Sequence, residues 1–593
     1  MRTEIRLDLA SLRELYKSGK ATPSDVIGVI YDRLAQGPLE PIWISVLSRD
    51  KAMAKARKLE RDPLASALPL YGVPFAVKDN IDLAGLPTTA GCPAYAYSPG
   101  HSARVVHALI EAGAIPIGKT NMDQFATGLV GTRSPHGACS SVFNPRYISG
   151  GSSSGSAVAV ASGLASFSLG TDTAGSGRVP AAFNGLVGLK PTRGVLSTQG
   201  VVPACRTLDC VSIFAANAED AHTIWLAARG FDSDDPFSRA PRPGEDAAPW
   251  LAGEFRFGVP PAEQLEFFGD EGAAILYDEA VARLESIGGR KVEIDFSTFR
   301  SAAELLYAGP WVAERYAAIR AFIEEHAAAM NPVVRGIIEG ARRYSAADAF
   351  DAEYRLRELR RAAEAQWEQM DILALPTTGT IYTHDAVAAE PVRMNTNLGY
   401  YTNFVNLLDL AAVAIPGGRR PDGLPFGISI IGRAFSDEAL LAIAQRFGTP
   451  AEAAGQACPT GCVALAVVGA HLTGQPLNWQ LTDRGARVLK TCRTAPDYRL
   501  YALDGTIPPK PGLVRDRGFR GPGIEVEVWA VPEDRFGGFV ADVPAPLGIG
   551  SAVLDDGQTV KCFICEPYAI AGAAEVTRFG GWRSYLSQSA SIT

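Results

Sequence analysis

Two serine clusters and one lysine are the residues whose types and spacing could do chemistry in this sequence. Ser152 lies in the run GGSSSGSA, Ser176 closes the run GTDTAGS, and Lys78 ends the segment YGVPFAVK. A serine hydroxyl is barely acidic near pH 7, so it attacks an acyl carbon only when a base takes its proton. A neutral lysine can be that base, although a lysine at a strand end is also typical of a solvated charge or a salt bridge. The residues alone leave both interpretations of Lys78 open.

The two serine clusters lie in one small-residue stretch, 150–193. Between Gly150 and Thr171 this stretch contains no charged residue. Small residues allow close packing and let the backbone approach a ligand. The stretch is too polar to cross a bilayer, and its pattern predicts a buried helix that leads into a buried strand. That arrangement would fold the two clusters together.

Lys78, Ser152 and Ser176, in that order and in those motifs, make the chain resemble the amidase signature family over about residues 1–447. The resemblance implies a hydrolase in which Ser176 is the nucleophile, Ser152 relays the proton from a cis peptide bond and Lys78 is the base. It also implies that the GTDTAGS turn binds an oxyanion through backbone N–H groups. The residues that would donate them are Thr173, Ala174, Gly175 and Ser176. Members of the family more often have Gly at the position of Ala174.

Lys78 can accept a proton only in its neutral form. From a reference pKa of about 10.4, holding half of the lysine neutral at pH 7 costs about 4.6 kcal/mol. Burial away from acids supplies such a shift, and the apolar residues of YGVPFAV before Lys78 are consistent with burial. We therefore expect Lys78 to be buried and the neighbouring Asp79 to point elsewhere.

Residues 121–131, NMDQFATGLVG, match the family segment that lines one wall of the active site. Gly128 and Gly131 would let the backbone face a small substrate, and the resemblance makes Gly128 a substrate-binding candidate. Taken alone, the same residues are equally typical of an ordinary loop that contains glycine.

The segment TAGSGRVPAAFNGLVGLKPT most resembles the allophanate hydrolases within the family. That likeness implies hydrolysis of allophanate to ammonia and N-carboxycarbamate, which decays to further ammonia and carbon dioxide. Such a reaction needs no metal and no organic cofactor. A general amidase or an amidotransferase subunit of the same family is the alternative. An inactive scaffold is a third hypothesis, which the presence of Lys78, Ser152 and Ser176 disfavours.

Allophanate carries a carboxylate, so its pocket needs a cation. Tyr307 and Arg315, in LYAGPWVAERYAAIR, are about two helical turns apart and would share one face of a helix, unless Pro310 interrupts that helix. The resemblance implies that both bind the substrate carboxylate or its neighbouring amide, and a guanidinium suits a carboxylate bidentately. Arg178 is the rival cation. A surface pairing of Arg315 with a glutamate of its own helix is the structural alternative.

Two further motifs suggest different chemistry, but their context argues against it. Residues 113–120, GAIPIGKT, satisfy the phosphate-loop pattern G-x-x-x-x-G-K-[ST]. A phosphate loop leads from a strand through glycines into a helix, whereas the apolar residues here predict a buried strand and a structural Lys119. Residues 151–155 spell G-x-S-x-G around Ser153, but a poor strand precedes them and no histidine is an obvious partner.

Composition narrows the class of protein. With 593 residues, 47% hydrophobic and 20% charged, the chain is typical of a soluble globular protein long enough for several domains. Its net charge of −8 argues against a nucleic-acid or anionic-membrane surface. The N-terminal residues lack the apolar segment of a signal peptide, so we expect a cytoplasmic protein. Nine cysteines make no disulfide framework and seven histidines show no metal-binding pattern, so we expect no metal site.

Strand-like and helix-like segments alternate after residue 193. We expect strands at 255–259, 291–294 and 372–375, and helices at 271–286, 301–329 and 346–369. This alternation predicts an α/β fold, in which a mixed β-sheet flanked by helices forms the amidase signature core.

A small-residue segment rich in proline and glycine, 448–461, predicts a linker between a catalytic domain, 1–447, and a smaller α+β domain, 462–593. In the smaller domain we expect several strands and a helix near 483–492.

The smaller domain resembles the C-terminal domain of allophanate hydrolases, whose fold is similar to that of γ-glutamylcyclotransferases. The resemblance implies that it assists decarboxylation of N-carboxycarbamate or mediates assembly. It makes His471, in GAHLTGQPLN, the residue to test; a structural loop histidine is the alternative. A homodimer, in some cases assembled with pathway enzymes, is a family-level expectation.

Overall fold

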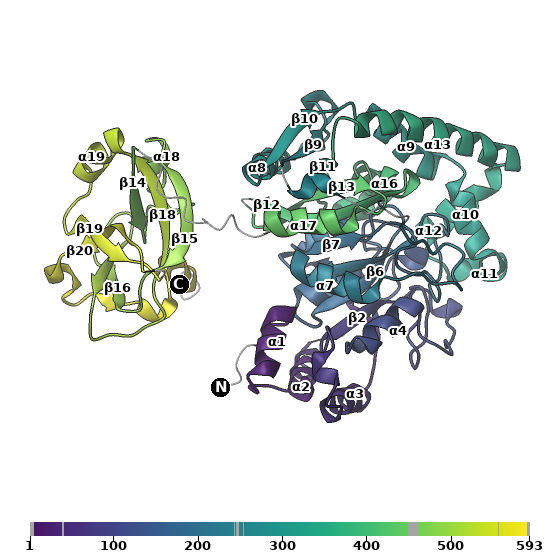
Figure 1. Ribbon diagram of the computed structural model, residues 1–593, viewed down its shortest axis with the longest axis horizontal. Helices are drawn as coiled ribbons and strands as arrows, with labels where there is room; N and C mark the ends of the chain where they lie inside the picture. Colours follow the sequence, from purple (N-terminus) through teal and green to yellow (C-terminus); the bar gives the residue numbers. More distant parts are fainter. Residues whose placement is uncertain are drawn as a thin grey trace. The chain divides into compact units, whose positions relative to one another are not determined.

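The computed structural model describes residues 5–37, 41–241, 244, 248–252, 254–420, 422–448, 461–555 and 557–589. The chain forms two compact units, which divide between Gly448 and Thr449 (Figure 1). Apart from its two end residues, the expected linker at 448–461 lies outside the described residues. No helix in the described part of the chain is both long and apolar enough to cross a membrane.

An eleven-stranded mixed sheet forms the centre of the first unit, in the order β1-β3-β2-β6-β8-β7-β12-β13-β11-β9-β10 (Figure 1). Strands β3, β2 and β6 are parallel, the strands from β6 to β11 pair antiparallel, and β11, β9 and β10 are parallel again. The strands are Trp43–Val46 (β1), Pro74–Lys78 (β2), Ile115–Thr120 (β3), Phe167–Asp172 (β6), Val187–Lys190 (β7), Cys210–Ala215 (β8), Phe255–Val259 (β9), Gly289–Glu293 (β10), Ile372–Pro376 (β11), Leu410–Arg419 (β12) and Pro425–Arg433 (β13). A separate two-stranded sheet joins Ser140–Ser141 (β4) to Asn144–Ile148 (β5).

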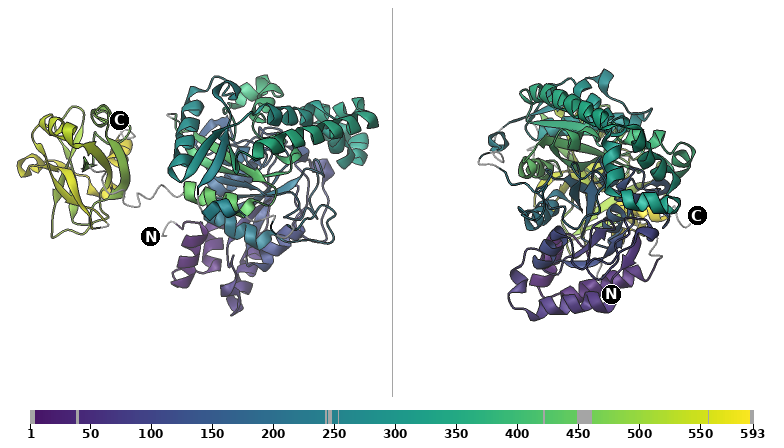
Figure 2. Two further views of the ribbon diagram at one scale, coloured as in Figure 1. Left: turned by 45° about the horizontal axis from the view of Figure 1, so that its top comes forward. Right: turned by 90° about the vertical axis from the view of Figure 1, so that its right-hand side faces the viewer.

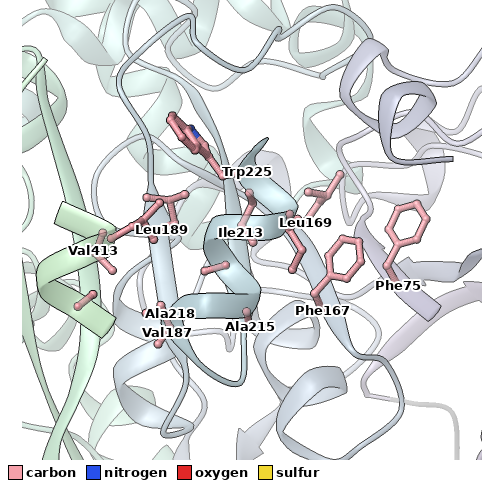
Figure 3. Close-up of a cluster of buried hydrophobic side chains, with 14 of the residues drawn as sticks. Phe75, Phe167, Leu169, Val187, Leu189, Ile213, Ala215, Ala218, Trp225 and Val413 are labelled. Carbon is pink, nitrogen blue, oxygen red and sulfur yellow. The ribbon is translucent and has the colours of Figure 1, made fainter. Parts of the chain in front are cut away.

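Helices cover both faces of the large sheet because successive side chains of a strand point to opposite sides. In β8, Ile213 belongs to the hydrophobic core that includes Trp225 of α7, whereas Phe214 packs with Ala157 of α5 and Ala181 of α6. Figure 3 shows side chains of the first of these cores, contributed by neighbouring strands and by α7. The predicted α/β fold, with a mixed sheet between helices, is confirmed.

The helices of the first unit range from short turns to the long helix α13, and several pack against one another or against the large sheet. Their bounds are Leu9–Lys17 (α1), Pro23–Leu34 (α2), Arg49–Arg61 (α3), Arg104–Glu111 (α4), Ser154–Ala161 (α5), Val179–Phe183 (α6), Ala218–Ala228 (α7), Glu271–Ser286 (α8), Ser297–Ala308 (α9), Trp311–Ala318 (α10), Arg320–His326 (α11), Pro332–Glu339 (α12), Ala346–Trp367 (α13), His384–Ala389 (α14), Arg393–Leu398 (α15), Phe404–Leu407 (α16) and Asp437–Gly448 (α17). Helices α2 and α3, drawn in purple, pack against each other, and α3 contacts β3 (Figure 2). Helix α13 packs along α9.

The small-residue stretch behaves as its pattern predicts. It forms helix α5, which leads into the fully buried strand β6, and α5 contacts that strand. The phosphate-loop pattern at 113–120 is also a buried strand, β3, as expected. Lys119 there is structural, because its amine donates to Thr88 Oγ1 at 2.9 Å and to Asp79 O at 3.3 Å.

Periodicity gave the bounds of β9 and α8 correctly, but the single helix expected at 301–329 is wrong. That segment forms α9, α10 and α11 in succession. Gly309 has extended backbone after α9, and Pro310 then precedes the first turn of α10. Proline has no N–H to continue a helix, but it fits at the start of one. Tyr307 and Arg315 therefore belong to different helices.

The second unit contains a five-stranded sheet, β15-β18-β14-β20-β19, and a three-stranded sheet, β17-β16-β21. Its elements are Cys462–Val467 (β14), Trp479–Thr482 (α18), Arg487–Arg493 (β15), Tyr498–Leu503 (β16), Lys510–Arg515 (β17), Glu525–Pro532 (β18), Glu533–Ala541 (α19), Leu547–Val553 (β19), Thr559–Cys565 (β20), Ala574–Glu575 (β21) and Trp582–Ser589 (α20). This agrees with the α+β class expected, while the likeness to γ-glutamylcyclotransferases stays a prediction. The helix expected near 483–492 is wrong. Most of it is β15, an edge strand that pairs antiparallel with β18, so tertiary pairing outweighs the local pattern.

Candidate active site

Lys78 is the last residue of β2, a strand that lies between β3 and β6 and is buried along its whole length. Its amine lies 2.7 Å from Ser152 Oγ and 2.7 Å from Thr171 Oγ1. The neighbouring Asp79 turns away, as expected, because its carboxylate accepts hydrogen bonds from the backbone and hydroxyl of Thr89. A buried amine therefore meets two hydroxyl groups, and no carboxylate of the described chain forms a salt bridge with it.

Burial brings Lys78 into the range where it can act as a base. Burial lowers the pKa of Lys78 to about 7, although the carboxylates of Asp123, Asp209 and Asp172 oppose part of that shift. A large fraction of the amine is then neutral near pH 7, as proton acceptance requires.

Ser152 lies in a buried loop just before α5. The Gly151–Ser152 peptide bond is cis, as the family resemblance implies. Gly151 N–H donates to Leu129 O at 2.8 Å, and Asp123 N–H donates to Ser152 O at 3.1 Å. A Cβ at Gly151 would overlap the Asp123 carboxylate, so a side chain at this position would push the two apart. The loop that carries Ser152 is thus held by the segment 121–131.

Ser176 closes the turn that follows β6, and Asp172 organises this turn. The Asp172 carboxylate accepts hydrogen bonds from Gly175 N at 2.9 Å, Gly177 N at 3.0 Å and Arg178 Nε at 2.9 Å. Burial alone would raise the pKa of Asp172, but Arg178, Lys190 and the Gly177 N–H together outweigh burial and hold that pKa below its usual value. Arg178, the rival cation, is therefore fully buried in an ion pair.

The Gly175 N–H group is engaged with Asp172, which changes the expected set of oxyanion donors. Within the described chain no hydrogen bond uses the N–H groups of Thr173, Ala174 or Ser176. The turn is fixed from outside by Thr402, whose hydroxyl donates to Ala174 O at 2.7 Å. Three backbone N–H groups of the GTDTAGS turn thus stay available to an oxyanion.

The hydroxyl of Ser176 faces the expected wall segment. It donates to Gly128 O at 3.4 Å, a long hydrogen bond that a substrate could replace. In the described residues no hydrogen bond joins the hydroxyls of Ser152 and Ser176. The structure therefore brings Lys78 and Ser152 into direct contact and leaves Ser176 turned toward Gly128.

Arg315 is a buried cation beside the same wall segment. Its Nη1 donates to Ala126 O at 3.3 Å and to Thr127 Oγ1 at 3.1 Å. Its Nη2 lies 3.5 Å from the hydroxyl of Tyr307, and its Cζ lies 5.6 Å from the centroid of that ring. The surface ion pair considered from the sequence does not form: Glu314 accepts from Thr207 instead, and Arg315 has no salt bridge in the described chain.

The segment Ala126–Gly128 connects the two ends of the site. The carbonyl of Ala126 and the hydroxyl of Thr127 contact Arg315, and the carbonyl of Gly128 contacts Ser176. A small molecule whose carboxylate meets Arg315 and whose acyl carbon meets Ser176 would lie along one short wall.

Several polar residues of the site were not singled out from the sequence. Thr171 shares the Lys78 amine with Ser152, and Asp209 accepts hydrogen bonds from Thr173 Oγ1 at 2.5 Å and Ala204 N at 2.8 Å. Burial raises the pKa of Asp209 to about 6. Asp123 lies inside the quoted segment NMDQF, but nothing in its spacing shows that it turns back toward Lys78.

In the second unit, His471 lines a cavity of about 150 Å³. Its Nε2 lies 2.9 Å from Gln480 Oε1, and its ring stacks on Phe563 with centroids 4.9 Å apart. Burial lowers the pKa of His471, and the nearby cations Lys510 and Arg484 act in the same direction. The imidazole is therefore neutral near pH 7, half-buried at the edge of a small pocket.

Comparison with known proteins identifies both units. Residues 34–441 match the protein family described as Amidase, and residues 463–587 match the allophanate hydrolase C-terminal domain. The chain is 44% identical over 609 residues to the urea amidolyase of Saccharomyces cerevisiae, an alignment that covers 97% of this chain and 33% of the amidolyase. It thus spans about a third of the length of that relative.

Solved structures agree with this result. The allophanate hydrolase of Kluyveromyces lactis is 43% identical, with a TM-score of 0.70 over 98% of this chain and 99% of that one. The first unit alone also has relatives of another kind. A glutamyl-tRNA(Gln) amidotransferase subunit from Symbiobacterium thermophilum is 35% identical, in an alignment that covers 74% of this chain and 95% of the relative.

Proposed function

This chain belongs to the amidase signature family, and we propose that it hydrolyses allophanate to ammonia and N-carboxycarbamate. The observation that carries the proposal is the wall segment Ala126–Gly128, which contacts a buried guanidinium at one end and the Ser176 hydroxyl at the other. The match of both units to allophanate hydrolase relatives supports the same substrate.

We assign the chemistry to Lys78, Ser152 and Ser176. Neutral Lys78 accepts the proton of Ser152, which in turn takes the proton of Ser176 as that hydroxyl attacks the terminal amide carbon. The N–H groups of Thr173, Ala174 and Ser176 stabilise the oxyanion. The proton returns to the leaving nitrogen, ammonia departs, and an acyl-enzyme remains. Water then attacks the ester by the same proton path and releases N-carboxycarbamate.

Arg315 supplies the selection for an acid-bearing amide. Its guanidinium is buried and has no carboxylate partner in the described chain, so a substrate carboxylate would satisfy it. Tyr307 is close enough to share that carboxylate or its neighbouring amide. Gly128 offers a carbonyl and no side chain, which leaves room for a small substrate.

The first test replaces the nucleophile. Ser176→Ala should abolish ammonia release from allophanate while thermal unfolding stays unchanged. Ser168→Ala is the matched control, because Ser168 is equally buried on β6 but bonds to the backbone of Ser156. Full activity of Ser176→Ala would remove this residue from the mechanism.

The second test separates substrates. Arg315→Met should weaken allophanate turnover by about 2–5 kcal/mol in kcat/KM and change little with biuret or other neutral amides. The alternative is a general amidase or an amidotransferase subunit, supported by the amidotransferase relatives of the first unit. Under that alternative glutamine is hydrolysed and Arg315→Met affects all amides alike.

For the second unit we propose that His471 and its cavity assist loss of carbon dioxide from N-carboxycarbamate. Lys510 also lines this cavity, and a cation suits a product with two carboxylates. We further propose a cytoplasmic homodimer, able to associate with enzymes of the same pathway. Light scattering of the purified chain tests the dimer, and copurification from cells tests the association.

A further inference from the structure

We propose that Asp123 is a positioning residue of the active site, which holds the wall segment against both serines and directs its charge at the Lys78 amine. The inference rests on the proposed role of Lys78 as the base. Asp123 is fully buried and is not one of the three residues to which the family resemblance assigns the chemistry.

The Asp123 carboxylate closes the chain from Asp123 to Arg133, which includes the wall segment Ala126–Gly128, into a compact loop. One oxygen accepts from Arg133 N at 2.8 Å, and the other accepts from Gly131 N at 3.0 Å. Within this loop Phe125 and Ala126 both have left-handed backbone, with φ of 50° and 53°. Non-glycine residues adopt this conformation at a cost and keep it where their surroundings enforce it. The two hydrogen bonds to Asp123 are part of that enforcement.

The same loop contacts both serines through its backbone. Asp123 N–H donates to Ser152 O at 3.1 Å, and the carbonyl of Gly128 accepts from Ser176 Oγ at 3.4 Å. The carbonyl of Leu129, the residue after Gly128, accepts from Gly151 N at 2.8 Å. Releasing the loop would therefore move the relay serine and the partner of the nucleophile together.

The charge of Asp123 acts on the Lys78 amine through space, without an ion pair between them. Four charged groups act on Lys78: the carboxylates of Asp123, Asp209 and Asp172 favour its ammonium form, and Arg315 opposes it. Asp123 has the largest effect of the four, second only to burial. Burial raises the pKa of Asp123 itself, which Arg133 and Lys78 partly offset. Without the Asp123 charge, burial would drive the Lys78 pKa further down.

The test is Asp123→Asn, which removes the charge and keeps the shape. The acid limb of the kcat/KM profile for allophanate should move to lower pH by about one unit or more, since an opposite charge at close range shifts a pKa by one to three units. The kcat at its plateau should fall at least about tenfold, because an amide cannot accept from both N–H groups if its NH₂ faces one of them. A purely structural role would lower kcat without moving the limb.

Two further variants separate the effect of the Asp123 charge from the effect of its position. Asp123→Glu keeps the charge and changes the reach, so its acid limb should stay in place while kcat falls. Asp437→Asn is the matched control, because Asp437 is equally buried and accepts from the backbone and hydroxyl of Thr192, but it is not among the four groups above. Its profile should match that of the unaltered protein.

A second readout keeps this inference separable from the proposed substrate. The rate at which a fluorophosphonate labels Ser176 reports activation of the serine whatever amide the enzyme hydrolyses. If the acid limb of the pH profile of labelling lies at lower pH in Asp123→Asn than in the unaltered protein, the inference is supported even if allophanate proves not to be the substrate. If the acid limb does not move in folded Asp123→Asn, the inference is overturned. Should Asp123→Asn fail to fold, Asp123→Glu decides, and an unchanged kcat in that variant overturns the positioning role.

Discussion

The active site of the first unit and the cavity of the second unit use buried titratable groups in different ways. Lys78 contacts the hydroxyls of Ser152 and Thr171 and is acted on by three carboxylates. The His471 ring lies against Phe563 and Phe539, and its Nε2 lies beside the amide oxygen of Gln480. In the function that we propose, the first site moves protons and the second holds a small molecule beside a neutral imidazole.

This difference follows the difficulty of the two reactions that we propose. An amide is resonance-stabilised and its nitrogen leaves poorly, so hydrolysis needs a nucleophile, a base and an oxyanion site at once. Loss of carbon dioxide from N-carboxycarbamate occurs without help, so the product still forms when the pocket is impaired. We therefore expect large effects from changes in the first unit and small effects from changes in the second.

The largest effect is expected from removing the base. Lys78→Met should lower kcat for ammonia release by at least about 10⁴-fold, because members of a triad act as one unit. Ammonia release from allophanate measures it, and the second unit should keep its stability. Lys55→Met, a change at an exposed position of helix α3, is the control. Activity of Lys78→Met within about tenfold of the unaltered protein would contradict the role of Lys78 as the base.

The next largest effect is expected from breaking the ion pair between Arg178 and Asp172 in the GTDTAGS turn. Arg178→Met leaves the Asp172 carboxylate buried without its partner, which should destabilise the first unit by about 3–5 kcal/mol. Hydrogen exchange followed by mass spectrometry should show the loss in the first unit only. Arg357→Met removes an exposed ion pair and should cost under about 1 kcal/mol. Equal losses for the two variants would contradict the role given to Arg178.

The pH dependence should be set by the first unit alone. Lys78 must be neutral to accept a proton and its pKa is about 7, so kcat/KM for allophanate should fall about tenfold per pH unit below that value. Ammonia release from about pH 5 to pH 9 measures the profile. His471→Asn should leave it unchanged. An acid limb below about pH 5 would mean that another group is the base.

The smallest effect is expected in the second unit. His471→Asn should slow the appearance of carbon dioxide by roughly two- to tenfold and leave the first ammonia unchanged, since the decarboxylation also proceeds unaided. His384→Asn is the matched control, because His384 is also partly buried and its Nε2 lies 3.0 Å from the hydroxyl of Ser140. A loss of the first ammonia in His471→Asn would show that the two units are not independent.

The candidate reactive groups and several core strands follow from local sequence patterns. Motif order singled out Lys78, Ser152 and Ser176. The apolar run before Lys78 and the small-residue stretch predicted that β2 and β6 would be buried, and β9 was predicted as a strand. These features are local, because periodicity and small-residue runs express the burial of one element at a time. Local pattern failed where a single residue or a neighbouring strand decided the outcome, at Pro310 and in β15.

Which groups meet depends on the three-dimensional fold. The contact of Arg315 with Tyr307 spans a helix break, and the capture of the Gly175 N–H by Asp172 depends on the shape of one turn. The closure of Asp123 onto Gly131 and Arg133 encloses two left-handed residues, Phe125 and Ala126. Charges act through space and hydrogen bonds require direction, so neither can be read from spacing along the chain.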